Sequence, residues 1–164
     1  MVLGLLCACS PDQEIDITFD PCSPLTLVPS DGTRQLEQDS MQAAIDHWSR
    51  VLPTRIEVGA WPDAGPALPI FFESGDTFYR AVYWDSIGEI SISREKLAAD
   101  DWALALAHEM GHAFGLFHVD IEERASVMNV GNLEVVPDDA DAAAIRALWP
   151  ACNWLLLDAA SRQR

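Results

Sequence analysis

The feature that most constrains this chain is a helix-forming stretch that is apolar nearly all the way round. Residues 102 to 114 read WALALAHEMGHAF, and either Asp100 or Asp101 is placed to cap a helix that starts at Trp102. A helix without a polar face must be buried, so we expect it in the middle of the domain. It carries His108 and His112, four residues apart, and this spacing places both imidazoles on one face of the helix.

A third histidine follows where this helix must end. Gly115 tolerates the left-handed conformation that terminates helices, and His118 comes three residues later, so the chain can fold back toward the first two histidines. Three neutral imidazoles without a fourth protein ligand leave one coordination position for water, as in a catalytic zinc site. Glu109 is offset from His108 by about 100° around the helix, so it can stand beside the metal without being a ligand.

These residues form the motif H-E-x-x-H-x-x-G-x-x-H, and the sequence resembles the metzincin clan of zinc endopeptidases at every fixed position. Metzincins also have a methionine in a turn beneath the metal, and Met128 in the sequence SVMN is similar to that residue. The resemblance implies an α+β zincin catalytic domain with a mixed twisted sheet, two long helices, an irregular lower subdomain and a C-terminal helix. It implies one catalytic Zn²⁺ bound by His108, His112 and His118, with Gly115 and Met128 as structural support. No motif supports a Ca²⁺ site.

The same resemblance implies hydrolysis of peptide bonds by a metal-activated water, with Glu109 as the general base. A polypeptide substrate would lie extended along an edge strand at about Tyr79 to Trp84. Residues 130 to 136 would wall the pocket for the side chain just past the scissile bond, and the apolar residues among them favour an apolar side chain: Leu133, Val135 and Val136.

Two other functions fit the motif. The chain can be a catalytically silent zinc-binding module of the same fold, or a metallohydrolase that acts on non-peptide amides. Glu109 favours catalysis over the silent module, because a degenerate protease commonly loses its general base while it keeps its ligands.

Within the clan, the closing helix with the sequence ALW at residues 147 to 149 is most similar to matrixins. Val119 differs from the serine that usually follows the third histidine in matrixins. Val130 stands where astacin-like and serralysin-like enzymes have a tyrosine. A matrixin-like member is the expected branch.

The first nine residues, MVLGLLCAC, resemble the tail of a secretion signal and are too short for the about 20 residues that a membrane span needs. The sequence LCAC resembles a bacterial lipobox, in which Cys9 would carry a lipid anchor, and plain secretion is the alternative. Both place the rest, residues 10 to 164, outside the cytoplasm as one catalytic domain that is secreted, periplasmic or membrane-anchored.

Two cysteines remain in that domain, Cys22 and Cys152. An even number of cysteines in an exported chain predicts a disulfide, which would tie the start of the domain to its end. The alternative is that Cys22 binds the zinc as an inhibitory thiolate, but the residues around it do not match that switch motif.

Charge limits the partners. Asp and Glu total 26 against 10 Lys and Arg, which gives a net charge of -16. Nucleic acid and anionic membrane surfaces would repel such a chain, and its 164 residues suit one domain, which we expect to be monomeric. His47 lies in a helical pattern away from the motif and is interpreted as a solvated or capping residue.

Hydrophobic periodicity and turn residues predict the remaining elements. Residues 21 to 32 are interpreted as turns, 59 to 66 as a loop and 120 to 133 as irregular. Asp138 is expected to cap the last helix, with Asp141 as a first-turn carboxylate. The expected strands are 15–19, 55–58, 68–73, 79–84 and 89–93, and the expected helices are 36–51, 102–114 and 138–148.

Overall fold

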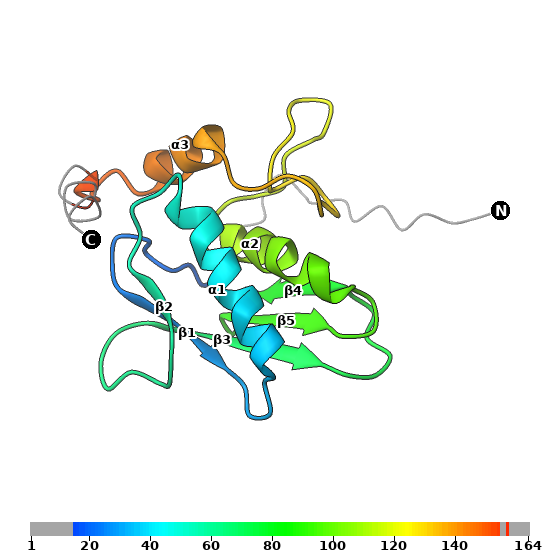
Figure 1. Ribbon diagram of the computed structural model, residues 1–164. Coiled ribbons are helices and arrows are strands. Elements are labelled where there is room, and N and C mark those ends of the chain that lie inside the picture. The colour runs from blue at the N-terminus through cyan, green and yellow to red at the C-terminus, as the bar shows by residue number, and fades with distance from the viewer. Residues whose placement is uncertain (1–14, 155–156, 158–164) are drawn as a thin grey trace.

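A mixed five-stranded sheet forms the base of the fold, in a computed structural model that describes residues 15–154 and 157 (Figure 1). The strand order is β2-β1-β3-β5-β4. All neighbours pair in parallel except β4, which lies at one edge and runs antiparallel to β5. The strands are β1 (Leu25–Pro29), β2 (Ile56–Val58), β3 (Ala67–Glu73), β4 (Ala81–Trp84) and β5 (Glu89–Ser93).

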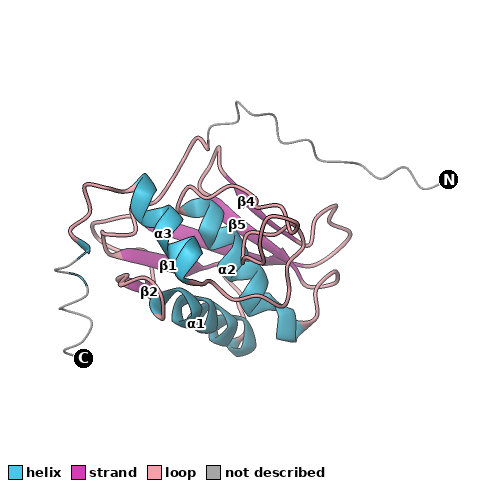
Figure 2. Ribbon diagram, turned by 90° about the horizontal axis from the view of Figure 1, so that it is seen from above, coloured by secondary structure: helices cyan, strands magenta, loops and turns pink. Residues whose placement is uncertain are grey.

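Two long helices, α1 (Gln35–Ser49) and α2 (Trp102–Ala113), cover one face of this sheet. A short 3₁₀ turn, η1 (Ala99–Asp101), leads into α2. The third helix, α3 (Asp139–Leu148), lies on the far side of α2 from the sheet, and an irregular segment joins these two helices (Figures 1 and 2). This arrangement agrees with the predicted α+β class at the level of a mixed sheet, two long helices, an irregular segment and a C-terminal helix.

The core lies between the sheet and the two long helices. Leu27 and Ile70 point from the sheet into it, and Leu106 and Met110 of α2 meet them with no exposed surface. Burial on almost every side of α2 confirms what its apolar sequence predicts. Asp101 occupies the capping position of α2 but makes no side-chain cap hydrogen bond, because η1 precedes it.

Two sequence predictions near the start of the described chain are wrong. Residues 15 to 19 form no strand, because their hydrogen bonds go to two different places: Ile17 N–H donates to Asp85 O at 3.1 Å, and Phe19 N–H donates to Ala113 O at 2.7 Å. The true first strand is β1, inside the stretch predicted to be turns. Residues Leu25 to Val28 are all buried, so both faces of β1 are covered, and the surrounding Pro21, Pro24 and Pro29 are the turn signals that favour the other interpretation.

The other predicted elements are present with ends shifted by a few residues, and the edge strand starts at Ala81 instead of Tyr79. A disulfide joins Cys22 and Cys152, as predicted, so Cys22 is not free to act as a zinc-binding thiolate. Among the described residues, no helix is long and apolar enough to cross a membrane. The predicted signal or lipobox, with Cys9, lies outside the described residues.

Candidate metal centre

Three histidine side chains converge at the C-terminal end of α2. His108 and His112 project from one face of the helix, and Nε2 of His118 lies 3.2 Å from Nε2 of each. Gly115 adopts φ +98°, and this left-handed conformation turns the chain back so that His118 can reach them. The sequence spacing therefore predicts the cluster correctly, and its three ring nitrogens can hold a metal ion.

Backbone carbonyls fix the orientation of the two helical imidazoles. Nδ1 of His108 lies 2.6 Å from Val127 O, and Nδ1 of His112 lies 2.7 Å from Leu116 O. A carbonyl oxygen can only accept, so each Nδ1 carries the proton and donates it. Each Nε2 is then left with a lone pair that points to the centre of the cluster, which is the tautomer that a metal ligand needs.

Burial keeps these imidazoles neutral. It lowers the pKa of His108 to about 4 and that of His112 to about 3, with the neighbouring imidazoles acting in the same direction. It also lowers the pKa of His118. At neutral pH all three side chains are therefore available as ligands.

The cluster fits a zinc ion. Nε2 of His118 lies 3.2 Å from each of the other two, and unprotonated nitrogens this close repel one another unless a cation lies between them. Zinc–nitrogen bonds of about 2.0–2.1 Å in a tetrahedral arrangement separate the ligand atoms by about 3.3 Å, close to the observed spacing. The set of three nitrogens and no sulfur is that of catalytic zinc sites.

Glu109 lies next to this cluster, at the free edge of the sheet. Its Oε2 accepts a hydrogen bond from Tyr83 N–H of β4 at 2.8 Å, and the residue is only 7% exposed. Arg80 O accepts a hydrogen bond from Ser93 N–H of β5, so every second residue from Arg80 onward turns its backbone N–H and carbonyl toward β5. Tyr83 is one of the residues in between, so its N–H points away from β5. Burial raises the pKa of Glu109 to about 8, whereas a cation beside the carboxylate favours its charged form.

Met128 lies in a buried turn against α2. Its Cε is 3.1 Å from the position that a side-chain carbon on Gly111 would occupy, and Trp48 Cζ2 is 3.4 Å from that position. Val119 N–H donates to Met128 O at 3.0 Å, so the strand-like segment after His118 is tied to the same turn. The motif spacing gives no role to Gly111, although a glycine inside a helix signals a close approach of this kind.

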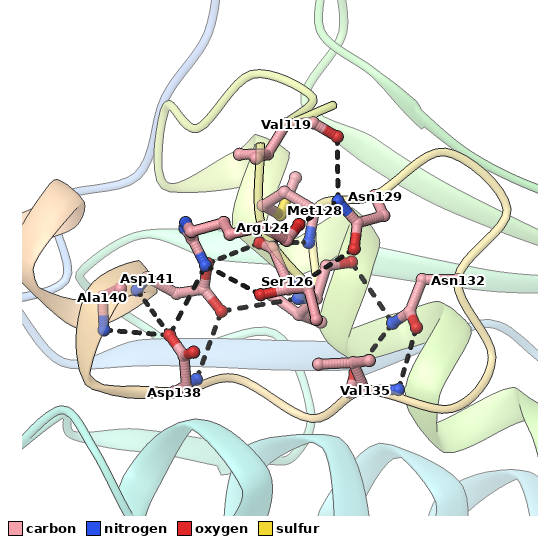
Figure 3. A network of polar contacts seen from close by, with 12 residues as sticks. Val119, Arg124, Ser126, Met128, Asn129, Asn132, Val135, Asp138, Ala140 and Asp141 are labelled. Carbon is pink, nitrogen blue, oxygen red and sulfur yellow. Dashed lines mark hydrogen bonds and ion pairs between the residues drawn. The ribbon is translucent and has the colours of Figure 1, made fainter. Parts of the chain in front are cut away.

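A buried carboxylate from α3 holds this turn in place (Figure 3). Asp141 is fully buried, and its Oδ1 accepts hydrogen bonds at 2.6 Å from both the Arg124 guanidinium and Ser126 Oγ. Its Oδ2 accepts from Asp138 N–H at 3.2 Å, and Asp138 in turn caps α3, as predicted. The sequence identifies Asp141 as a capping residue but not as the anchor of the methionine turn, which is 13 residues away along the chain.

A pocket of about 750 Å³ opens beside His118. The segment that sequence analysis assigned to its wall contributes Val130, Leu133 and Val135, but Val136 does not line it. Two carboxylates that the apolar interpretation did not include, Asp120 and Glu134, also lie along it. His47 is not part of the histidine cluster; it lies on α1, where Arg50 is 3.5 Å from its Nδ1.

Comparison with known proteins adds no assignment: no protein-family model matches this chain, and no curated protein sequence matches it.

Proposed function

We propose that this chain is a zinc-dependent endopeptidase of the metzincin clan, of matrixin-like type. The observation that carries the proposal is the placement of Glu109. It directly follows His108 of the histidine cluster on α2, and its carboxylate accepts a hydrogen bond at the free edge of β4. A general base, a metal site and a strand that can pair with an extended peptide therefore meet at one place.

The chain would hold the ion through Nε2 of His108, His112 and His118. When bound, zinc supplies a Lewis acid that polarises a carbonyl and makes a water more acidic. Glu109 is positioned to accept a proton from the attacking water and to deliver it to the leaving amine. Its hydrogen bond to Tyr83 N–H fixes the carboxylate while this proton moves.

The free edge of β4 supports a polypeptide substrate over a small amide. The outward-facing N–H and carbonyl of Ala81 and the carbonyl of Tyr83 can pair with an extended chain, whereas Tyr83 N–H is held by Glu109. The pocket beside His118 can take one substrate side chain. We also propose an extracytoplasmic location, because a disulfide such as Cys22–Cys152 persists in oxidising compartments.

The test combines metal analysis with turnover. We expect about one zinc per chain and chelator-sensitive cleavage of an unfolded protein such as casein. Glu109→Gln should lose at least about 10²-fold in cleavage rate and keep its zinc, because a base is removed but no ligand is. Glu57→Gln, at an exposed carboxylate of β2, is the matched control and should cleave at the wild-type rate.

The alternatives give different results. A silent zinc-binding module retains zinc but never cleaves casein, and a metallohydrolase of non-peptide amides turns over acylated amines while casein stays intact. Casein cleavage by Glu109→Gln at the wild-type rate would overturn the mechanism.

A further inference from the structure

A second pocket lies on the other face of the sheet from the histidine cluster. Its volume is about 620 Å³, and side chains from β3, β4, β5 and the loop between β3 and β4 line it. Along β4, Tyr83 points toward the helices and is buried, so its neighbour Trp84 points to the opposite face. The site is therefore separate from the proposed catalytic centre and shares no residue with it.

Three aromatic rings form the wall of this pocket. Phe78, Tyr79 and Trp84 lie with ring centroids 5.2 to 6.1 Å apart and with interplanar angles between 73° and 86°. Phe78 is 85% exposed, so it contributes almost nothing to the core. An exposed ring supported by two others at near right angles presents aromatic faces to whatever enters the pocket.

A chain of hydrogen bonds sets a carboxylate against these rings. Trp84 Nε1–H donates to Ser91 Oγ at 3.1 Å, and that hydroxyl donates to Glu73 Oε1 at 3.3 Å. The Tyr79 hydroxyl donates to Glu73 Oε2. Both carboxylate oxygens and two of the three rings are thus held in fixed positions before any ligand arrives.

All the charged side chains that line this pocket are negative. Glu73, Asp76 and Glu89 line it, and no Lys, Arg or His is among the lining residues. Among the described residues, no basic side chain forms an ion pair with Glu73. Two cations lie at the rim of the pocket: Lys96 Nζ is 3.8 Å from the fully exposed Asp76, and Arg94 pairs with Glu37 at 2.7 Å and donates to Ser74 Oγ at 3.3 Å.

We propose that this pocket binds a lysine or arginine side chain of a polypeptide. Aromatic faces and a carboxylate without an ion-pair partner together favour a cation. A neutral side chain would instead remove water from the carboxylates without replacing the hydrogen bonds that this water makes. We take the cation to belong to a polypeptide because the edge of β4 lies next to the pocket. Alternate side chains of a strand added to that edge point to this face of the sheet. This last step rests on the proposed binding of extended substrates, but occupancy of the pocket does not require cleavage.

Binding is measured on the full chain carrying Glu109→Gln, so that no probe is hydrolysed. The probe is the peptide acetyl-Ala-Lys-Ala-amide, and acetyl-Ala-norleucine-Ala-amide is its neutral counterpart. The readout is the NMR signal of the Trp84 indole N–H, which the Ser91 hydrogen bond places inside the site. We expect the lysine peptide to shift this signal in a saturable way and the norleucine peptide to leave it unchanged.

Two variants distinguish binding in this pocket from general attraction of the cationic peptide to a negatively charged protein. Phe78→Ala removes an exposed ring without changing any charge and should weaken binding about three- to tenfold. Its control is Trp61→Ala, at another exposed aromatic residue, which should have no effect. Glu73→Gln should weaken binding by more than Glu57→Gln, which removes a charge outside the pocket.

Several results would overturn the proposal. One is equal binding of both peptides, which would indicate an apolar groove. Another is a shift with maltotriose but not with the lysine peptide, which would indicate a carbohydrate site. A third is unchanged binding in Phe78→Ala. None of these results bears on casein cleavage by the wild-type chain, so a failure here is distinguishable from a failure of the proposed protease function.

Discussion

Met128 packs against the backbone of Gly111, on the turn of α2 between His108 and His112. A methyl group at Gly111 would collide with the methionine sulfur and lie 3.1 Å from its Cε. We expect Gly111→Ala to destabilise the protein by about 1–3 kcal/mol through overpacking, although alanine has the better helix propensity by about 1 kcal/mol. Urea denaturation measures the change in the free energy of unfolding.

A double variant tests the cause. With Met128→Ala the collision disappears, so adding Gly111→Ala to that background should be neutral or stabilising. If Gly111→Ala costs the same in both backgrounds, contact with Met128 is not the reason for the glycine.

Asp141 and Arg124 are expected to set the stability of the methionine turn. Asp141→Asn keeps the shape of the side chain but removes the charge that faces the guanidinium at 2.6 Å. Because Arg124 is still 28% exposed and can be partly hydrated, we expect a loss of about 2–3 kcal/mol, less than for a fully buried pair. Asp139→Asn, at an exposed position in the same first turn of α3, is the control and should cost below about 1 kcal/mol. If Asp141→Asn and Asp139→Asn lose the same free energy of unfolding, the effect of Asp141 comes from the helix dipole and not from its contact with Arg124.

A fully buried carboxylate on α1 makes the stability depend on pH. Burial alone would raise the pKa of Glu37, but its hydrogen bonds to Arg94 and Arg34 outweigh burial and lower the pKa to about 2. Because the folded-state pKa lies below the ordinary value of 4.5, this stabilisation is complete above about pH 4.5 and is lost as the pH falls toward 2. The shift corresponds to about 3 kcal/mol.

The measurement is urea denaturation of the wild type and Glu37→Gln between pH 7 and pH 2. We expect the variant to be less stable by about 3 kcal/mol at neutral pH, with the difference shrinking below pH 4.5. A difference that stays constant over this range would assign the effect of Glu37 to packing instead of ionisation.

The sequence predicts local features of this molecule better than contacts between distant segments. The histidine spacing and Gly115 are local, because a helix followed by a left-handed turn is sufficient to bring His118 back to its neighbours. The position of Glu109 at the edge of β4 is not local, since it depends on how α2 crosses the sheet. Central strand β1 is not predicted, for a different reason. Its apolar residues Leu25, Leu27 and Val28 form a short pattern that is surrounded by Pro21, Pro24 and Pro29, which signal turns.

Zinc is expected to stabilise the fold by linking α2 to the segment that follows it. His118 is the ligand outside the helix, and its Nε2 faces only the other two imidazoles among the hydrogen-bond partners in the described part of the chain. Binding to the folded state alone adds about 2.7 kcal/mol to the free energy of unfolding when free zinc is 100 times the dissociation constant. Chelation should therefore lower the melting temperature of the wild type, and added zinc should restore it.

Variant His118→Ala should lose most of its zinc and show no change in melting temperature on chelation, because two imidazoles remain and the link to the loop is gone. His47→Ala is the matched control. It removes a histidine on α1 that does not belong to the cluster, so its zinc content and its response to chelator should equal those of the wild type. Full zinc occupancy in His118→Ala would contradict the assignment of the third ligand, whichever reaction the protein catalyses.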